Sequence, residues 1–306
     1  MTAPERTPAP SGTVSRPVIR ARDLTMAYGD VAVLHGVDLE IHRGEVFALL
    51  GPNGAGKTTT VEILEGFRRR SAGEVRVLGA DPERGDDAWR GRIGLVLQSW
   101  RDHRRWRVAE LLTHFATYYP HPRDPAELLA LVGLTDQAGR QVDRLSGGQR
   151  RRLDVALGIV GRPELLFLDE PTTGFDPEAR HEFHVLVERL ARDDGVTVLL
   201  TTHDLAEAER LADRIAMLVG GRIRACGTPS ELARRAAAQA EVRWTADDGT
   251  YRRERTADPS RLVWELHRDA DGPIAGLEVR RPTLEDTYLH MVHQKDGSTD
   301  GEAAAV

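Results

Sequence analysis

Gly51-Pro52-Asn53-Gly54-Ala55-Gly56-Lys57-Thr58-Thr59 is the stretch of this 306-residue chain that decides its fold. It lies between an apolar run, Val46 to Leu50, and a segment from Lys57 to Gly66 that we predict to be a helix. Its glycines let backbone N–H groups curl around an oxyanion without Cβ clashes, and the helix that follows directs its positive dipole end at the same place. In such a pattern the lysine reaches nucleotide phosphates and the next hydroxyl can bind Mg²⁺. The pattern arises by chance in roughly one chain in a hundred, but the flanking strand and helix argue against chance and predict a phosphate cradle.

Length and composition limit the class of protein. A chain of 306 residues with 40% hydrophobic residues is globular and long enough for one large domain with a smaller companion. No apolar run approaches the roughly 18 residues that cross a bilayer, so a role at a membrane would require a separate spanning partner. The net charge of −6 argues against bulk binding of nucleic acid. The single cysteine, Cys226, fits a reducing cytoplasm, and we interpret it as an inert packing residue.

Short apolar runs, turns and helical patterns alternate up to about residue 236. Strands are predicted at Val18–Leu24, Val37–Ile41, Val46–Leu50, Gly73–Gly79, Ile93–Leu97, Leu165–Leu168, Val196–Leu200, Ile215–Val219 and Arg222–Ala225. A helical pattern occupies Val108 to Leu134, with a break at Tyr119-Pro120-His121-Pro122, and another helix runs from Leu145 through Val160. These elements predict an α/β protein with a sheet core and an inserted helical region at about 99–160.

The two ends of the chain differ from this pattern. Residues 1–16 and 294–306 are polar, lack an apolar centre and are predicted to be disordered tails, and the first is no signal peptide. Before the second tail, the pattern of residues 237–293 predicts a small α+β domain. Its elements are strands at Glu241–Trp244, Tyr251–Arg255 and Leu277–Arg280 and helices at Pro259–His267 and Leu284–Val292. A unit of about 55 residues has little core of its own, so we expect its neighbour to support it.

Two of the predicted strands end in residues that carry chemistry. Leu165 to Leu168 ends in Asp169-Glu170, and Val196 to Leu200 ends in Thr201-Thr202-His203. The carboxyl ends of parallel strands meet at one edge of a sheet, where ligands bind. Leu145-Ser146-Gly147-Gly148-Gln149 opens a helix whose first turn offers free N–H groups, which makes it a second candidate anion site.

Five more motifs accompany the phosphate cradle in a fixed order. The six motifs together closely resemble those of the ATP-binding cassette (ABC) ATPases. They are Tyr28 (aromatic loop), Gly51 to Thr59 (Walker A), Gln98 (Q-loop), Leu145 to Gln149 (signature), Leu165 to Glu170 with Asp176 (Walker B and D-loop) and His203 (H-loop). Taken alone, Tyr28, Gln98, Glu170 or His203 could be structural or solvated, and it is the combination that is specific. The resemblance implies a P-loop NTPase cassette over 17–236, with a mixed sheet core, an antiparallel β subdomain and a helical subdomain.

The resemblance also implies a role for each residue. ATP would be bound by Tyr28, which stacks on adenine, and by Gly51, Pro52, Asn53, Gly54, Ala55, Gly56, Lys57, Thr58 and Thr59. Mg²⁺ would be held by Thr58, Gln98 and Asp169, and the catalytic residues would be Glu170, which polarises the attacking water, with Lys57 and His203. Ser146, Gly147, Gly148 and Gln149 would close over ATP bound to a second copy, with Asp176 at the same interface. Two ATP molecules would then be sandwiched in a head-to-tail homodimer.

Two segments are similar to the daunorubicin-resistance branch of this family, whose ATPases serve separate permeases. They are Thr173 to Arg180, in which Phe175 replaces a more usual leucine, and Arg281 to Leu289. The small domain after Ala236 is similar to the accessory domain of that branch, with a regulatory or dimer-supporting role. The resemblance therefore implies an ATP-hydrolysing subunit that energises a transmembrane permease in drug or antibiotic export. Such a subunit would be cytoplasmic and peripheral on the inner face of the membrane.

Two alternatives stay open. One is a soluble ABC ATPase that acts on ribosomes or nucleic acid, but ribosome-acting members carry two cassettes and DNA-acting ones a long coiled-coil insertion, and this sequence has neither. The other is a nucleotide-sensing regulator without transport.

Trp100 to Arg107 is a basic segment with interleaved aromatic residues. It could be a solvated loop, a surface that docks a membrane subunit, or a nucleic-acid contact. We favour docking because the segment directly follows Gln98, where the resembled family grips a permease helix. Nucleic acid is not an expected partner.

Overall fold

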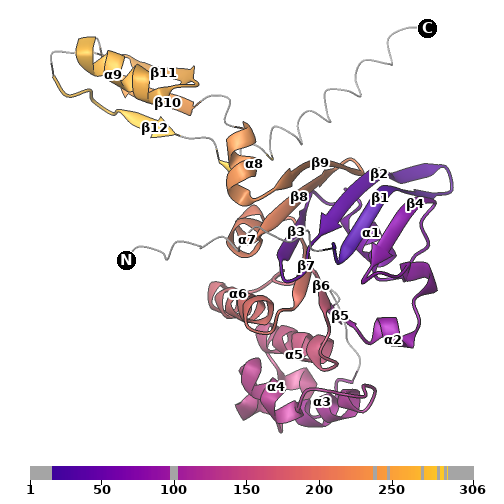
Figure 1. Cartoon of the computed structure of the whole chain (residues 1–306). Helices are drawn as coiled ribbons and strands as arrows, with labels where there is room; N and C mark the ends of the chain where they lie inside the picture. Colours follow the sequence, from indigo (N-terminus) through magenta and orange to yellow (C-terminus); the bar gives the residue numbers. More distant parts are fainter. Residues whose placement is uncertain are drawn as a thin grey trace.

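A six-stranded sheet forms the centre of the computed structural model, which describes residues 16–96, 103–236, 240–246, 249–269, 272–280, 283–285 and 288. The strands are β3 (Val46–Leu50), β5 (Ile93–Val96), β6 (Leu165–Asp169), β7 (Thr197–Thr202), β8 (Arg214–Val219) and β9 (Arg222–Gly227). Their order is β5-β6-β7-β3-β8-β9, and every pairing is parallel except that of β8 with β9 (Figure 1). The carboxyl ends of β3, β6 and β7 therefore meet at one edge.

A second, antiparallel sheet contains β1 (Ile19–Tyr28), β2 (Val31–Ile41) and β4 (Ala72–Val77) in the order β2-β1-β4. The first two strands are longer than the sequence predicted. The register of β1 against β2 shifts between Ala21 and Leu24, and Asp23 has a φ of 46°. This irregularity breaks the alternation of buried and exposed residues, so the alternation that predicts the strand stops at Leu24.

Helices cover the sheets. Near the central sheet lie α1 (Lys57–Leu64), α5 (Gly147–Ile159), α6 (Pro177–Arg192), α7 (Leu205–Leu211) and α8 (Pro229–Ala236), and the short α2 is Asp87–Arg90. The helical region that the sequence predicted contains α3 (Val108–Ala116) and α4 (Pro125–Leu131) at the far end of the molecule in Figure 1. Short 3₁₀ turns are formed by Pro82–Arg84, Thr135–Gln137 and Val142–Arg144.

Two apolar cores lie on opposite faces of the central sheet. Along β3, Ala48 and Leu50 belong to the core shared with the helices, whereas Phe47 and Leu49 belong to the core shared with α1 and the antiparallel sheet. A strand buried on both faces needs a continuous apolar sequence, and β3 has one. The edge that carries the site is therefore held by packing on both sides.

A third, small unit contains β10 (Ala240–Thr245), β11 (Tyr251–Thr256), α9 (Pro259–Asp269) and β12 (Glu278–Arg280). Its sheet is antiparallel, with the order β11-β10-β12, and Val242 of β10 is fully buried. After β12, Leu284 is fully buried in the same apolar core as α5 and α6, and Tyr288 packs against that core. The sequence assigned Leu284 to the small domain, whereas its side chain contributes to the cassette.

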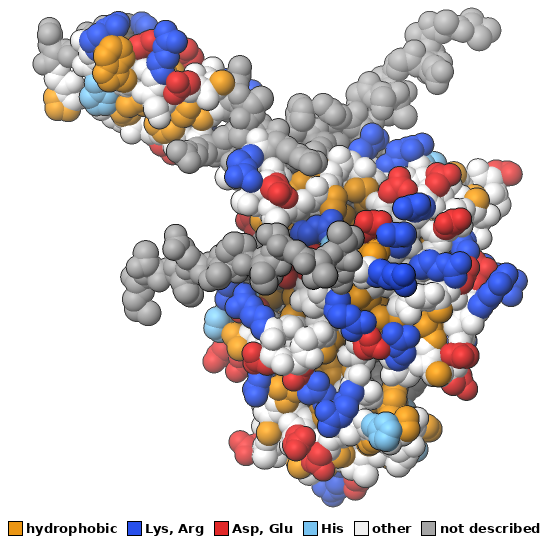
Figure 2. All heavy atoms as spheres, viewed as in Figure 1, with side chains coloured by type: hydrophobic (Ala, Val, Ile, Leu, Met, Phe, Trp, Pro, Cys, Tyr) orange, Lys and Arg blue, Asp and Glu red, His pale blue; other side chains and the backbone are white. Residues whose placement is uncertain are grey.

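Among the described residues, no helix combines the length and the apolar character that spanning a membrane would need. On the face shown in Figure 2, basic and acidic side chains are interspersed over the cassette. Residues 1–15 and 289–306, which include nearly all of both predicted tails, lie outside the described residues.

Candidate functional site

The loop between β3 and α1 has the backbone shape of an anion cradle. Gly54 and Gly56 adopt positive φ angles of 77° and 102°, and Gly56 is the N-cap of α1. That conformation is open to glycine and strained for other residues. Gly51 is needed for a different reason, because a Cβ there would lie 2.3 Å from the carbonyl oxygen of Leu218. Tight packing against β8 thus fixes the start of the loop.

Lys57 is enclosed by the loop that it follows. Its Nζ donates hydrogen bonds to the carbonyl oxygens of Gly51 (2.8 Å) and Pro52 (3.3 Å) and lies 3.8 Å from Oε1 of Glu170. The side chain is only 6% exposed, and burial lowers its pKa, although Glu170 and Asp169 oppose that effect. An ammonium group is therefore held beside two carboxylates at the mouth of the cradle.

The end of β6 places the two predicted acidic residues at that same edge. The hydroxyl of Thr201 on β7 donates a hydrogen bond to Oδ1 of Asp169, and it accepts one from the backbone N–H of Glu170 at 3.1 Å. Glu170 has a φ of 40°, a strained value for a residue with a side chain. Such strain is held in place by the contacts around it, and here it turns the carboxylate towards Lys57 and His203.

His203 follows β7, and its Nδ1 lies 3.3 Å from Oε1 of Glu170. Its side chain is 50% exposed, whereas that of Glu170 is 16% exposed. The imidazole can therefore meet a bound molecule from the solvent side while it orients the carboxylate behind it. Of the expected catalytic residues, the structure brings Lys57, Glu170 and His203 together.

Tyr28 ends β1 near the cradle, with its hydroxyl 3.4 Å from Oγ1 of Thr59. The side chain is 42% exposed, and the guanidinium of Arg68 lies over its ring at 4.9 Å from the centroid. A cation thus lies over one face of a ring that is partly exposed, and an exposed aromatic ring can stack on a flat ligand. Arg68 was not among the predicted residues, since sequence spacing carries no signal for this contact.

The signature residues lie at the start of α5, outside the loop between β3 and α1 that forms the cradle. Ser146 is the N-cap, its side chain accepts a hydrogen bond from the N–H of Gln149 (3.2 Å), and Oε1 of Gln149 accepts one from the N–H of Ser146 (3.1 Å). This reciprocal pair is a capping box. Ser146 and Gly147 are exposed, and within the described residues no hydrogen bond joins the signature to residues 51–59. The structure does not bring these two predicted halves of the site together within one chain.

Asp176 begins α6 as its N-cap, and its side chain accepts a hydrogen bond from the N–H of Ala179 at 2.8 Å. The residue is exposed. Phe175, the departure from the usual leucine, packs edge-to-face against Phe183 with ring centroids 5.9 Å apart. A phenylalanine therefore fits here without disturbing the turn that presents Asp176.

Arg151 is a buried residue that sequence reasoning missed. It lies one turn into α5, is 6% exposed, and donates hydrogen bonds to the carbonyl oxygens of Asp169 (2.8 Å) and Pro171 (3.1 Å). The signature helix is thereby bonded directly to the chain that carries the two acidic residues. An arginine on the inner face of a helix with apolar neighbours was the signal that could have found it.

Gln98 lies outside the described residues, as do positions 100–102 of the basic segment. The described part of that segment joins an aromatic cluster on α3, because Trp106 packs on His114 with centroids 4.9 Å apart and His103 packs on Phe115 at 5.8 Å. Trp106 is 36% exposed. The cluster presents a ring surface beside arginines.

Comparison with known proteins agrees with this geometry. The family model described as ABC transporter matches residues 34–173. A fluoroquinolones export ATP-binding protein of Mycobacterium tuberculosis is 41% identical over 98% of this chain and 96% of its own length. A daunorubicin resistance ATP-binding protein of Streptomyces coeruleorubidus is 35% identical over 94% of this chain and 98% of its own length.

The fold is shared with solved cassettes as well. A structure described as the dimeric structure of a bacterial ABC transporter cassette superposes with a TM-score of 0.61 and 25% identity, covering 69% of this chain and 98% of that one. Relatives matched over nearly their whole length are more than one third identical, and the cradle, Asp169-Glu170 and His203 follow neighbouring strands at one edge of the central sheet. This chain therefore belongs to the ABC transporter family and is one of its ATP-binding ATPases.

Proposed function

We propose that the chain is the ATP-hydrolysing subunit of an exporter and drives a separate membrane permease. The observation that carries this proposal is the strained Glu170, held at the cradle mouth 3.8 Å from Lys57 and 3.3 Å from His203. Relatives that cover nearly the whole chain are named export and drug resistance ATP-binding proteins, which favours a small drug or antibiotic as the transported molecule.

The nucleotide would occupy the loop from Gly51 to Thr59, with adenine on the open face of the Tyr28 ring. Lys57 would exchange its hydrogen bonds to the loop carbonyls for bonds to phosphate oxygens, which are stronger acceptors. That exchange separates Lys57 from Glu170 and frees the carboxylate to orient a water molecule. His203, exposed on the solvent side, would contact the terminal phosphate.

The oxygen atoms available at the cradle suit Mg²⁺. Thr58 is exposed at the start of α1, and Asp169 is positioned by the Thr201 hydroxyl, so the two would hold the ion together with Gln98. Within the described residues there is no cluster of three or more His, Cys, Asp or Glu side chains that could hold a metal. Mg²⁺ commonly needs only one or two protein carboxylates when phosphates supply the rest, and it would neutralise the charge that develops on them.

Hydrolysis in this proposal requires two chains. The exposed N-terminus of α5, with Ser146, Gly147, Gly148 and Gln149, would close over ATP held by a second copy, and exposed Asp176 would lie at the same interface. A homodimer is the simplest arrangement for a chain with one cassette, and a similar cassette has been solved as a dimer. Through its hydrogen bond to the carbonyl oxygen of Asp169, Arg151 would couple a movement of the signature helix to a movement of Asp169.

The permease would be docked at the cytoplasmic face of the membrane, with residues 17–236 as the motor and the small domain of residues 237–293 in a supporting or regulatory role. The aromatic cluster around Trp106 favours docking over nucleic-acid contact, because Trp106 and His103 pack into α3. The mixed charges in Figure 2 also do not form an extended basic surface on the face shown.

The test is a pull-down of tagged Glu170→Gln protein from detergent-solubilised native membranes in the presence of ATP, followed by mass spectrometry. This variant should bind ATP, dimerise and stall, so we expect a polytopic membrane protein without a cassette of its own. The same pull-down with Lys57→Ala is the matched control and should recover less of it. Recovery of ribosomes or DNA with no membrane protein would refute the exporter and favour the soluble alternative.

A further inference from the structure

The described residues include two glutamates that are buried, Glu65 and Glu207. Glu65 is the C-cap of α1, and its carboxylate accepts no hydrogen bond within the described part of the chain. Glu207 lies on α7 and is only 3% exposed, but its carboxylate accepts hydrogen bonds from the hydroxyl groups of Thr202 and Thr172. Burial raises the pKa of Glu207, and these two bonds oppose the rise. A buried carboxylate with two donors is held in one orientation.

The bond from Thr172 connects Glu207 to the turn that follows β6. Oγ1 of Thr172 donates to Oε1 of Glu207 over 2.7 Å, and the threonine is itself buried. Thr172 lies two residues after Glu170 and four before Asp176. Its carbonyl oxygen also accepts a hydrogen bond from the N–H of Phe175 at 3.1 Å, which closes the turn. Glu207 therefore holds the short segment between the acidic residue of the site and the proposed dimer contact at Asp176.

The bond from Thr202 connects Glu207 to the end of β7. Thr202 is the last residue of that strand and is buried, and its hydroxyl, which donates to Glu207, accepts a hydrogen bond from the N–H of Asp204 at 3.0 Å. His203 lies between these two residues. The carbonyl oxygen of Thr202 accepts a hydrogen bond from the N–H of Gly51 at 3.3 Å. The residue beside His203 is thus bonded to the cradle through its backbone and to Glu207 through its side chain.

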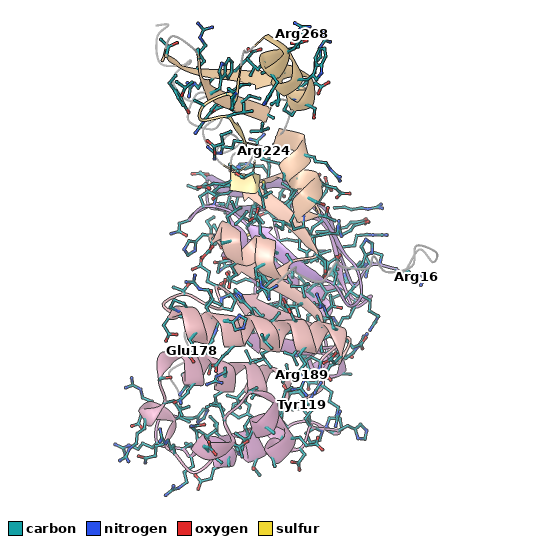
Figure 3. All side chains as sticks on the ribbon, turned by 90° about the vertical axis from the view of Figure 1, so that its left-hand side faces the viewer. Arg16, Tyr119, Glu178, Arg189, Arg224 and Arg268 are labelled. Carbon is teal, nitrogen blue, oxygen red and sulfur yellow. The ribbon has the colours of Figure 1, made fainter. Side chains whose placement is uncertain are left out.

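A histidine of α6 lies near the same carboxylate but does not hold it. Nε2 of His184 is 3.9 Å from Oε1 of Glu207, and it has no hydrogen-bond partner within the described residues. Burial lowers the pKa of His184, so its imidazole is neutral at pH 7. Helix α6 is the one on which Figure 3 labels Glu178 and Arg189. The two threonine hydroxyls are therefore the groups that fix the direction of the Glu207 carboxylate.

We propose that Glu207 is a positioning residue for ATP hydrolysis. It bonds the turn between Glu170 and Asp176 to the strand end that carries His203, so that these two segments move together. The inference rests on the proposed function, because it takes Glu170 and His203 to act on ATP and Asp176 to lie at the dimer interface. Closure of a second copy on Asp176 then acts on the distance between Glu170 and His203, which is 3.3 Å in this structure. Groups that act on one water molecule must be held to a fraction of an ångström.

The first test is steady-state ATP hydrolysis by the full chain. In Glu207→Met the side chain keeps its length but accepts no hydroxyl bond, so kcat should fall about tenfold or more while KM for ATP changes less than about twofold. Glu207→Gln keeps one acceptor oxygen and should recover most of kcat. The matched control is Glu188→Gln on α6, because Oε1 of Glu188 lies 3.3 Å from Nη1 of Arg210 on α7, and it should hydrolyse ATP as the natural chain does. An unchanged kcat in Glu207→Met would refute the inference.

A loss of stability would also lower the activity, so a second variant separates the two effects. Glu207→Met combined with Thr172→Val replaces both partners of the 2.7 Å bond by apolar groups of similar shape. Such a replacement is nearly neutral, so the midpoint of urea unfolding should lie closer to that of the natural chain than that of Glu207→Met alone does. The kcat should stay low, because the two segments are no longer bonded. A kcat that returns together with the stability would overturn the inference.

A third measurement shows whether Glu207 acts through His203. Single-turnover ATP hydrolysis is compared for His203→Ala with and without Glu207→Met. Because the histidine that Glu207 positions is already removed, the second change should lower the rate less than about twofold. A further loss of about tenfold would mean that Glu207 acts elsewhere, which would refute the inference and leave the proposed function standing. A His203→Ala variant as fast as the natural chain would instead refute the role of His203 in the proposed function itself.

Discussion

Replacing Glu65 by glutamine should stabilise the protein, and increasingly so as the pH rises. The side chain keeps its size, and the change removes only the ability to ionise. In the folded chain the pKa of Glu65 is about 8, against an ordinary value of 4.5. The unfolded chain therefore loses this proton at a lower pH than the folded chain does, so the free energy of unfolding of the natural protein falls between pH 4.5 and pH 8. Glutamine does not ionise, so the free energy of unfolding of the variant does not fall for this reason.

The size of the effect follows from the same two values. Each pKa unit corresponds to about 1.4 kcal/mol, so the gain should be about 1 kcal/mol at pH 5.5, about 3 kcal/mol at pH 7 and about 5 kcal/mol above pH 8. Urea unfolding of the full-length natural chain and of Glu65→Gln at these three pH values measures it directly.

Glu62→Gln is the matched control, because Glu62 is partly exposed and paired with Arg68. Its charge is the smallest of the three causes that raise the pKa of Glu65, so its replacement should give a much smaller gain with pH than Glu65→Gln does. A difference between Glu65→Gln and the natural chain that stays flat from pH 5.5 to 8.5 would mean that the buried carboxylate has a compensating partner, and it would contradict the raised pKa of Glu65.

Three further changes test the nucleotide site. Lys57→Ala should weaken ATP binding about a hundredfold, since the phosphates lose their charged donor, and unchanged affinity in a filter assay would contradict the cradle. Gly51→Ala should lower the free energy of unfolding by about 2 kcal/mol or more in urea titrations, because the new Cβ would lie 2.3 Å from the Leu218 carbonyl oxygen; a neutral result would show that the loop can shift freely. Arg151→Lys should cost about 2–4 kcal/mol by the same assay, because an ammonium cannot reproduce the bonds to the Asp169 and Pro171 carbonyls, and full stability would remove that residue from its linking role.

Much of the fold was predictable because local rules and tertiary packing agree. The apolar run Val46 to Leu50 is β3, and the helix predicted from Lys57 ends two residues early at Leu64. The strands predicted on either side of Gly220-Gly221 are present as the antiparallel pair β8 and β9. The acidic residues after Leu168 reach the same edge as the cradle, since parallel strands place their carboxyl ends together.

The remaining features depend on contacts between distant residues. The sequence offered an N-cap at Asp176 and a proline at the first helical position for α6, but that helix was not predicted. The positive φ of Glu170 and the Thr201 bond that accompanies it arise only when β6 and β7 lie side by side. The contact of Arg68 with the Tyr28 ring and the burial of Glu65 likewise exist only in the assembled fold, because they bring together residues that are distant in the sequence.

The burial of Leu284 means that the core of the cassette includes a residue from beyond the small domain. Leu284 follows the small β10–β12 sheet and is buried in the cassette core, so the chain contributes to that core on both sides of the sheet. A shortened protein that stops at Ala236 would leave the site of Leu284 open to solvent. Its free energy of unfolding should fall by about 2–5 kcal/mol, as it does when a buried leucine is removed.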